Sequence, residues 1–78
     1  ESAMDLLRQK EEICRRLNDP NGLALCLANK AHLFAYDLNQ PHEALPLIEE
    51  AVALARQHGL IALSQQIQPI LDEIRSMQ

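Results

Sequence analysis

Aromatic residues are almost absent from this sequence of 78 residues, which contains one Tyr, one Phe and no Trp. The core must therefore be built from Leu, Ile and Ala. Only two residues are Gly, and Ala, Leu, Glu and Gln are abundant, a composition that favours helix and disfavours sheet. A chain of this length forms one small domain at most. We therefore expect residues 1–78 to form a single all-α domain.

Long apolar runs are also lacking. No stretch approaches the ~20 apolar residues that a membrane span needs. The charged N-terminal segment has no apolar core of the kind that a secretory signal requires. The chain begins with Glu1 and not with Met, so we expect it to be a fragment or a processed form of a longer protein.

An excess of positive charge is missing as well, since the formal net charge is −4. The first seventeen residues hold four basic side chains and four acidic ones, which balance each other. Residues 18–78 carry three basic and seven acidic side chains, so no basic stripe remains. This distribution argues against nucleic acid and against an anionic membrane as a partner.

Cysteine is scarce, and patterns typical of catalysis are missing. Cys14 and Cys26 belong to no CxxC motif and no Cys/His cluster, so they form no metal signature. We interpret them as small buried residues with free thiols, which suit a reducing compartment, and we expect a cytoplasmic location. No Ser lies in a Gly-x-Ser-x-Gly motif, and no Cys–His pair shares a helical face. The sequence thus predicts no enzyme activity, no catalytic residue, no metal site and no cofactor.

Apolar residues recur at helical spacing in four segments, 3–17, 21–38, 42–58 and 60–77, which we predict to be helices. Asp19 is placed to cap the second helix, and Gly59 is a stop signal after the third. The predicted buried face of the second helix consists of Ala24, Leu27, Ala28, Ala31, Phe34, Ala35 and Leu38. That of the third helix consists of Ala44, Leu47, Ile48, Ala51, Leu54 and Ala55.

The fourth segment is the least regular of the four. Pro69 should kink it, because proline cannot donate a hydrogen bond to the Gln65 carbonyl. Pro46 lies only about one turn into the third helix, so it should bend the start of that helix without breaking it. Several polar residues make the outer face of the fourth segment polar, which fits a terminal cap on a stack of helices. The fourth helix is either such a cap or a degenerate repeat helix.

The first and third predicted helices are related in sequence. The segment AMDLLRQKEEICRR at 3–16 aligns with ALPLIEEAVALARQ at 44–57, an offset of 41 residues. Under this alignment Leu6 corresponds to Leu47 and Ile13 to Leu54. Helix pairs that recur with a period near 40 residues are typical of a solenoid. We therefore predict a short antiparallel helical-repeat stack, an α-solenoid of about four helices.

The chain resembles the tetratricopeptide repeat (TPR) family over nearly its whole length. Small residues at Ala31, Ala44 and Ala51 occupy places where the two helices of such a repeat pack. The segments EICRRLNDPNGLA at 12–24 and LANKA at 27–31 are similar to a longer-period bacterial subtype. The resemblance implies a scaffold or adaptor that binds a peptide or another protein without catalysis.

In such repeats the first helix of each pair lines a concave groove, so the resemblance implies a candidate binding face on the second helix. Four residues at helical spacing form this candidate face: Leu25, Asn29, His32 and Tyr36. An Asn there can hold a peptide backbone through both ends of its amide, and Tyr adds apolar area and a hydroxyl. The alternative is that these residues face solvent or an adjoining helix and bind no ligand. A basic clamp for a peptide carboxylate is not expected, because Lys30 points away from this face.

A second hypothesis is self-association without a separate ligand. Repeat arrays need about three repeats for stability, and this chain holds fewer. Leu23, Cys26 and Leu33 flank a side of the second helix that its main apolar stripe does not use. We expect a homodimer or a domain-swapped assembly formed through such faces.

Overall fold

A computed structural model describes residues 3–77 as an all-helical chain, and no strand occurs among them. Its helices are α1 (Ala3–Leu17), α2 (Pro20–His32), α3 (Pro41–Gln57) and α4 (Ile61–Ser76), and a π-helical segment, η1 (Leu33–Asp37), directly continues α2. The predicted all-α fold and the four predicted helices are thus confirmed. None of the helices within residues 3–77 has the length and apolar character needed to cross a membrane.

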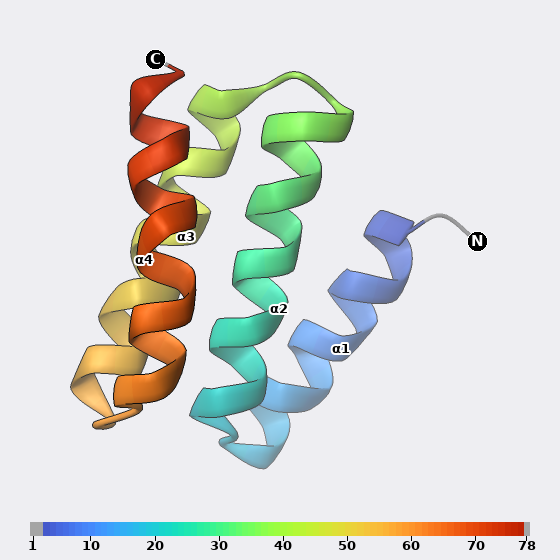
Figure 1. Ribbon diagram of the computed structural model, residues 1–78. Coiled ribbons are helices and arrows are strands. Elements are labelled where there is room, and N and C mark those ends of the chain that lie inside the picture. The colour runs from blue at the N-terminus through green and yellow to red at the C-terminus, as the bar shows by residue number, and fades with distance from the viewer. Residues whose placement is uncertain (1–2, 78) are drawn as a thin grey trace.

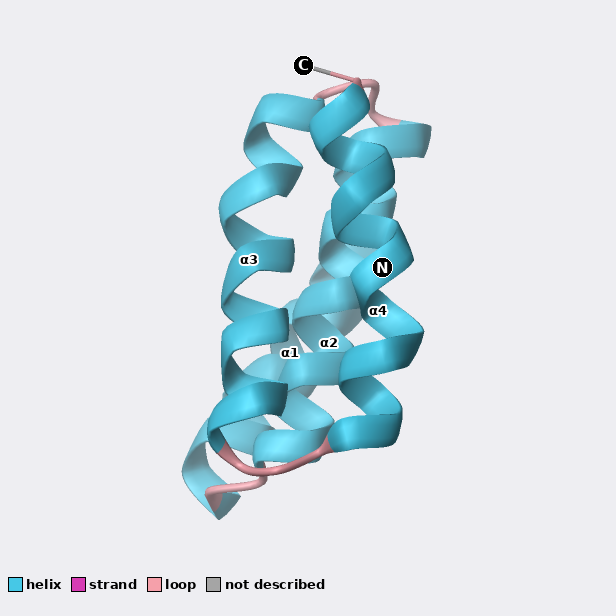
Figure 2. Cartoon of the chain, turned by 60° about the vertical axis from the view of Figure 1, so that its left-hand side comes forward, coloured by secondary structure: helices cyan, strands magenta, loops and turns pink. Residues whose placement is uncertain are grey.

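Each helix runs antiparallel to the one before it (Figure 1). The most extensive contact joins α2 to α3, followed by those of α3 with α4 and of α1 with α2, and α2 also touches α4. In Figure 1, α2 stands between α1 and α4, with α3 behind. The Cα atoms span 32 × 31 × 15 Å, so the domain is flat, and Figure 2 shows α3 and α4 side by side from its edge.

The helix ends are determined by local backbone chemistry. The Asp19 carboxylate accepts a hydrogen bond from the Gly22 N–H at 3.2 Å and caps α2, as predicted. Gly59 follows α3 with φ of 69°, and Leu60 N–H donates to the Ala55 carbonyl at 2.7 Å, which closes a Schellman turn. Asn18 ends α1 in the same way with φ of 57°. These turns reverse the chain within two or three residues and make successive helices antiparallel.

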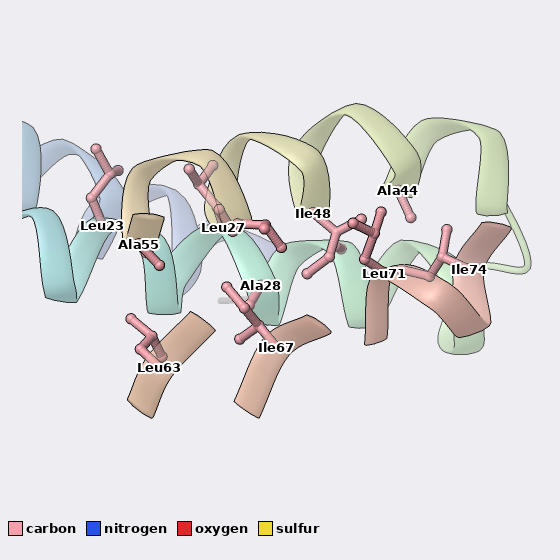
Figure 3. Packing of buried hydrophobic residues seen from close by; sticks show 14 of the residues in the cluster. Leu23, Leu27, Ala28, Ala44, Ile48, Ala55, Leu63, Ile67, Leu71 and Ile74 are labelled. Atoms are coloured by element: carbon pink, nitrogen blue, oxygen red, sulfur yellow. The ribbon is translucent and has the colours of Figure 1, made fainter. Parts of the chain in front are cut away.

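The core lies where α2, α3 and α4 meet. Its largest fully buried side chains are Leu27, Ile48, Ile67 and Ile74 (Figure 3). Alanines on α2 and α3, among them Ala31 and Ala44, have no exposed surface and let the two backbones approach closely. The buried faces predicted for the second and third helices are confirmed, except that Leu38 is exposed and Phe34, Leu47 and Leu54 are only partly buried.

Helix α1 packs less tightly than the others and has no fully buried residue. Leu6, Ile13 and Leu17 are 47%, 54% and 72% exposed on it. The expectation that Leu23, Cys26 and Leu33 form an unused apolar side of the second helix is wrong. Leu23 and Cys26 are buried and Leu33 is partly buried, because α1 and the core take up the sides of α2 on which they lie. The unused apolar surface belongs to α1 instead.

Neither internal proline interrupts its helix. Helices α3 and α4 are both continuous through Pro46 and Pro69. Pro69 and Gln65 are both exposed, and water can therefore satisfy the Gln65 carbonyl that loses its intrahelical partner. An exposed position thus tolerates the proline without ending the helix.

Candidate functional site

The four residues of the predicted binding face are all exposed, on α2 and on its π-helical continuation. They do not form one surface with a single neighbour. Leu25 and Asn29 lie beside α1, whereas Tyr36 contacts α4. The structure therefore divides the predicted face into two halves.

The first half lines an open cleft of about 250 Å³ between α1 and α2. Ile13 and Leu25 expose apolar side chains there, Asn29 offers an amide that both donates and accepts hydrogen bonds, and Lys10 adds a positive charge. The complete lining consists of Lys10, Ile13, Cys14, Gly22, Leu25, Cys26 and Asn29. Such a mixture can hold an apolar side chain and a nearby polar or negatively charged group.

Gly22 makes the close approach of α1 and α2 possible at this cleft. A Cβ atom at this position would lie 2.6 Å from the Asp19 Oδ2 atom and 2.8 Å from the Cys14 Sγ atom. Both distances are shorter than van der Waals contact, so any larger residue would push α1 away or displace the cap of α2. Glycine, which has no Cβ atom, therefore lets the two helices approach this closely.

The second half of the predicted face is engaged within the chain. The rings of His32 and Tyr36 lie 4.5 Å apart between centroids at an interplanar angle of 41°. A hydrogen bond from the Tyr36 hydroxyl to the Glu73 carboxylate on α4, with smaller contributions from burial and from the charge of Glu73, raises the pKa of Tyr36 to about 12. Tyr36 thus connects the end of the second helix to α4.

The π-helical segment η1 determines where Tyr36 lies. Leu38 N–H donates to the Leu33 carbonyl at 3.0 Å, an i to i+5 bond, and Gln40 N–H donates to the Phe34 carbonyl at 2.7 Å. Asn39 follows with φ of 52° and ends the segment. The wider turn changes the angle between successive side chains, so the regular α-helical spacing used in the prediction does not hold beyond His32.

A cluster of ion pairs positions α1 against its neighbours. Glu11 on α1 pairs with Lys30 on α2 at 2.8 Å and with Arg15 at 3.2 Å, and Arg15 also reaches Glu50 on α3 at 3.4 Å. Partial burial alone would raise the pKa of Glu11, but the hydrogen bonds and charges of Lys30 and Arg15 outweigh it and lower that pKa. Lys30 is therefore bound to Glu11, as expected of a residue that points away from the candidate face.

A larger cleft of about 510 Å³ lies where α1, α2 and α3 meet at one end of the domain. Sequence reasoning did not predict it, because its lining comes from three helices and a turn. Its Arg15 side chain already pairs with two carboxylates, and its Asp19 caps α2. The smaller cleft is the better candidate, because it holds two residues of the predicted face and the exposed apolar side chains of Ile13 and Leu25.

The residues from α1 were also missed as site residues. Lys10 and Ile13 lie on the most strongly amphipathic helix of the chain, and their pattern predicted only a helix with an apolar face. The one signal that could have identified them is the alignment of α1 with α3, because Lys10 stands where α3 has the buried Ala51. A charged residue on α1 at the position that is buried on α3 indicates that no other helix covers this part of α1.

The titration of Tyr36 can be measured directly, because it is the only tyrosine and the sequence has no Trp. We expect its phenolate absorbance to appear with a midpoint near pH 12, and replacement of Glu73 by Gln should return the midpoint toward ~10. The raised pKa means that the bond to Glu73 stabilises the fold below pH ~10, and this contribution is lost as the pH rises through about 12. The neighbouring change Asp72→Asn is the control and should leave the midpoint in place. A native midpoint near 10 would contradict the contact.

No group of three or more His, Cys, Asp and Glu side chains within residues 3–77 is arranged to hold a metal ion. No family model matches the chain, and no curated protein and no solved structure is detectably similar to it. A function must therefore be inferred from the residues and the geometry of the chain itself.

Proposed function

We propose that the chain is a non-catalytic protein-interaction segment that binds a peptide or a helix of a partner protein in the cleft between α1 and α2. The observation that carries this proposal is the exposure of Ile13 and Leu25 on either side of that cleft, with Asn29 and Lys10 beside them. Apolar walls with a few polar groups are typical of peptide-binding grooves. The chemistry points to a ligand with an apolar anchor and a nearby carboxylate or backbone amide.

The proposed architecture is a TPR-like stack in which α2 and α3 form the central helix pair. Three features support it: the 41-residue relation between α1 and α3, the antiparallel order of the helices, and the contact of α2 with both α3 and α4. The exposed residues of α4 are mostly polar, among them Gln65, Gln66 and Glu73, which suits a terminal cap. In this proposal the open end of the stack lies at α1.

The cleft is tested with a peptide selected against the native chain from a random library displayed on phage. The double variant Leu25→Ala, Asn29→Ala should weaken its binding by tenfold or more, about 1.4 kcal/mol, because it removes one wall and the amide. The double variant Asn29→Ala, Tyr36→Ala should lose affinity as well, through Asn29, with helicity and assembly state unchanged. Isothermal titration calorimetry measures the affinities, and circular dichroism measures the helicity.

Two controls define the location of the site. The pair His32→Ala, Tyr36→Ala removes the other half of the predicted face and should change affinity by less than about threefold, below ~0.7 kcal/mol. The pair Gln57→Ala, Gln66→Ala lies on exposed surface of α3 and α4 and should have no effect. A peptide that binds the Leu25→Ala, Asn29→Ala variant as tightly as the native chain would rule out the cleft.

A second candidate function, self-association, is favoured by the exposed apolar residues of α1. Leu6, Ile13 and Leu17 recur along this helix, and roughly half or more of each residue stays exposed. Two copies that meet through α1 would bury these residues in an isologous homodimer, and exchange of α1 would give a domain swap. Sedimentation of the native chain at micromolar concentration, measured together with the variants used for peptide binding, should then show a dimer. A monomer would remove this candidate, and a dimer that dissociates in the Leu25→Ala, Asn29→Ala variant would make the cleft part of the dimer interface.

A further inference from the structure

The two cysteines of the chain meet where α1 crosses α2. Cys14 is partly buried on α1, and Cys26 is buried on α2 with 6% of its surface exposed. Both side chains line the cleft between the two helices, and the nearby Cys14 sulfur contributes, after burial, to the raised pKa of Cys26. Sequence separation gives no hint of this pairing, because eleven residues and a reversal of the chain lie between them.

The position of Gly22 independently places the Cys14 sulfur on α2. The Cys14 Sγ atom lies 2.8 Å from where a Cβ atom of Gly22 would stand, so it packs against the bare backbone of that residue. Gly22 and Cys26 are four residues apart and therefore lie one above the other on the same helix face. The absence of a side chain at Gly22 thus leaves the space through which Cys14 approaches Cys26.

We propose that Cys14 and Cys26 form a redox-active dithiol, which a hydroperoxide oxidises to an intrachain disulfide between α1 and α2. The reaction consumes two thiols and one peroxide and yields one disulfide and two water molecules when the oxidant is hydrogen peroxide. The two sulfur atoms lose two electrons, and the peroxide oxygens gain them. A thiol reductant reverses the reaction.

The environments of the two thiols assign the order of the steps. Cys14 lines both clefts and is the more accessible, so its thiolate attacks a peroxide oxygen. The O–O bond breaks, a sulfenic acid forms, and the leaving hydroxide takes up the proton that the thiol released and becomes water. Burial, with the nearby Cys14 sulfur, raises the pKa of the Cys26 thiol, which stays protonated during this first step. The Cys26 sulfur then attacks the Cys14 sulfur, its proton leaves with the hydroxyl group as water, and the disulfide forms.

The surroundings of the pair allow the bond to close. A disulfide needs a sulfur–sulfur distance of about 2.05 Å, shorter than any contact between two thiols, so the two helices must move closer together. Helix α1 has no fully buried residue and can adjust more easily than the core helices. The bond would tie this weakly packed helix to α2 and fix the width of the cleft that both thiols line. This site does not depend on the proposed binding of a partner.

The experiment uses the reduced native chain and hydrogen peroxide. We expect intact mass to fall by two hydrogen atoms, both thiols to be lost in a titration of the unfolded product, and peptide mapping to find the 14–26 link in a monomer. Dithiothreitol should restore both thiols. In Cys26→Ser, oxidation should stop at a sulfenic acid on residue 14 that dimedone traps, whereas Cys14→Ser should leave residue 26 reduced under the same exposure.

Three results would overturn the proposal. They are persistence of both thiols, a link between two chains in place of the intrachain link, and a gain of oxygen on each cysteine without any link. Peptide mapping of the native chain requires no variant, so the test holds even if a Ser variant fails to fold. A second readout is stability, since the oxidised chain should unfold at a higher urea concentration than the reduced chain, and an unchanged or lower midpoint would show that the bond strains the fold.

Discussion

Replacement of Ile48 by Ala should lower the free energy of unfolding by about 2–5 kcal/mol. Ile48 is fully buried on α3, and Figure 3 shows its side chain in the core with Leu71 of α4 close by. Truncation removes three carbons from a site that α2, α3 and α4 enclose together, so the cavity cannot be filled by the movement of one helix. A small domain has a total stability of only about 5–15 kcal/mol, so this single change consumes a large part of it.

Urea unfolding followed by circular dichroism measures this loss. The matched control is Ile61→Ala, the same chemical change on a residue of α4 that is 69% exposed. It should change the stability by no more than about 0.5 kcal/mol, because no packed neighbour is lost. If the two variants were equally stable, Ile48 would not occupy the centre of the core.

The core could be predicted from the sequence because its signal is local. Ala24, Leu27 and Ala31 follow the helical period, as do Ala44, Ile48 and Ala51, and each set is buried in the structure. The start of α2 was equally predictable, since Asp19 caps it through its own carboxylate. Such features depend on residues within a few positions of each other, and their chemistry does not require knowledge of the tertiary fold.

Features that depend on distant neighbours could not be predicted in this way. The amphipathic pattern of α1 shows that one face is apolar but not whether another helix covers it, and Ile13 proves to be exposed. The widened turn of η1, which packs against α3, and the interaction of Tyr36 with Glu73 of α4 both involve residues far away in the sequence. Helix α4 continues through Pro69, whose exposed position lets water replace the lost hydrogen bond.

The candidate site shows the same division between local and tertiary information. Helical spacing placed Leu25 and Asn29 on one exposed face, and the structure puts both of them in the cleft. The same spacing also included His32 and Tyr36, which the structure places in a separate ring contact. The α1 wall of the cleft requires knowledge of how α1 crosses α2, and the passage of α1 over Gly22 is visible only in three dimensions.

Replacement of Ala31 by Leu should destabilise the domain by about 1–3 kcal/mol through overpacking. Ala31 has no exposed surface and belongs to the row of small residues that lets α2 and α3 approach closely. Three additional carbons cannot be accommodated there unless the two helices separate or neighbouring side chains leave their preferred rotamers. The helix propensity of Leu is nearly that of Ala, so the expected loss comes from packing and not from the backbone.

The control Ala53→Leu makes the same substitution on α3 at an exposed position and should change the stability by no more than about 0.5 kcal/mol. Unfolding in urea compares the two variants, and a loss in Ala31→Leu no greater than in Ala53→Leu would contradict close packing of α2 on α3. The pair also separates scaffold from site, because the cleft lining includes neither Ala31 nor Ala53. If Ala31→Leu remains folded, a selected peptide should bind it with nearly native affinity. The strain lies between α2 and α3, whereas the peptide binds between α1 and α2.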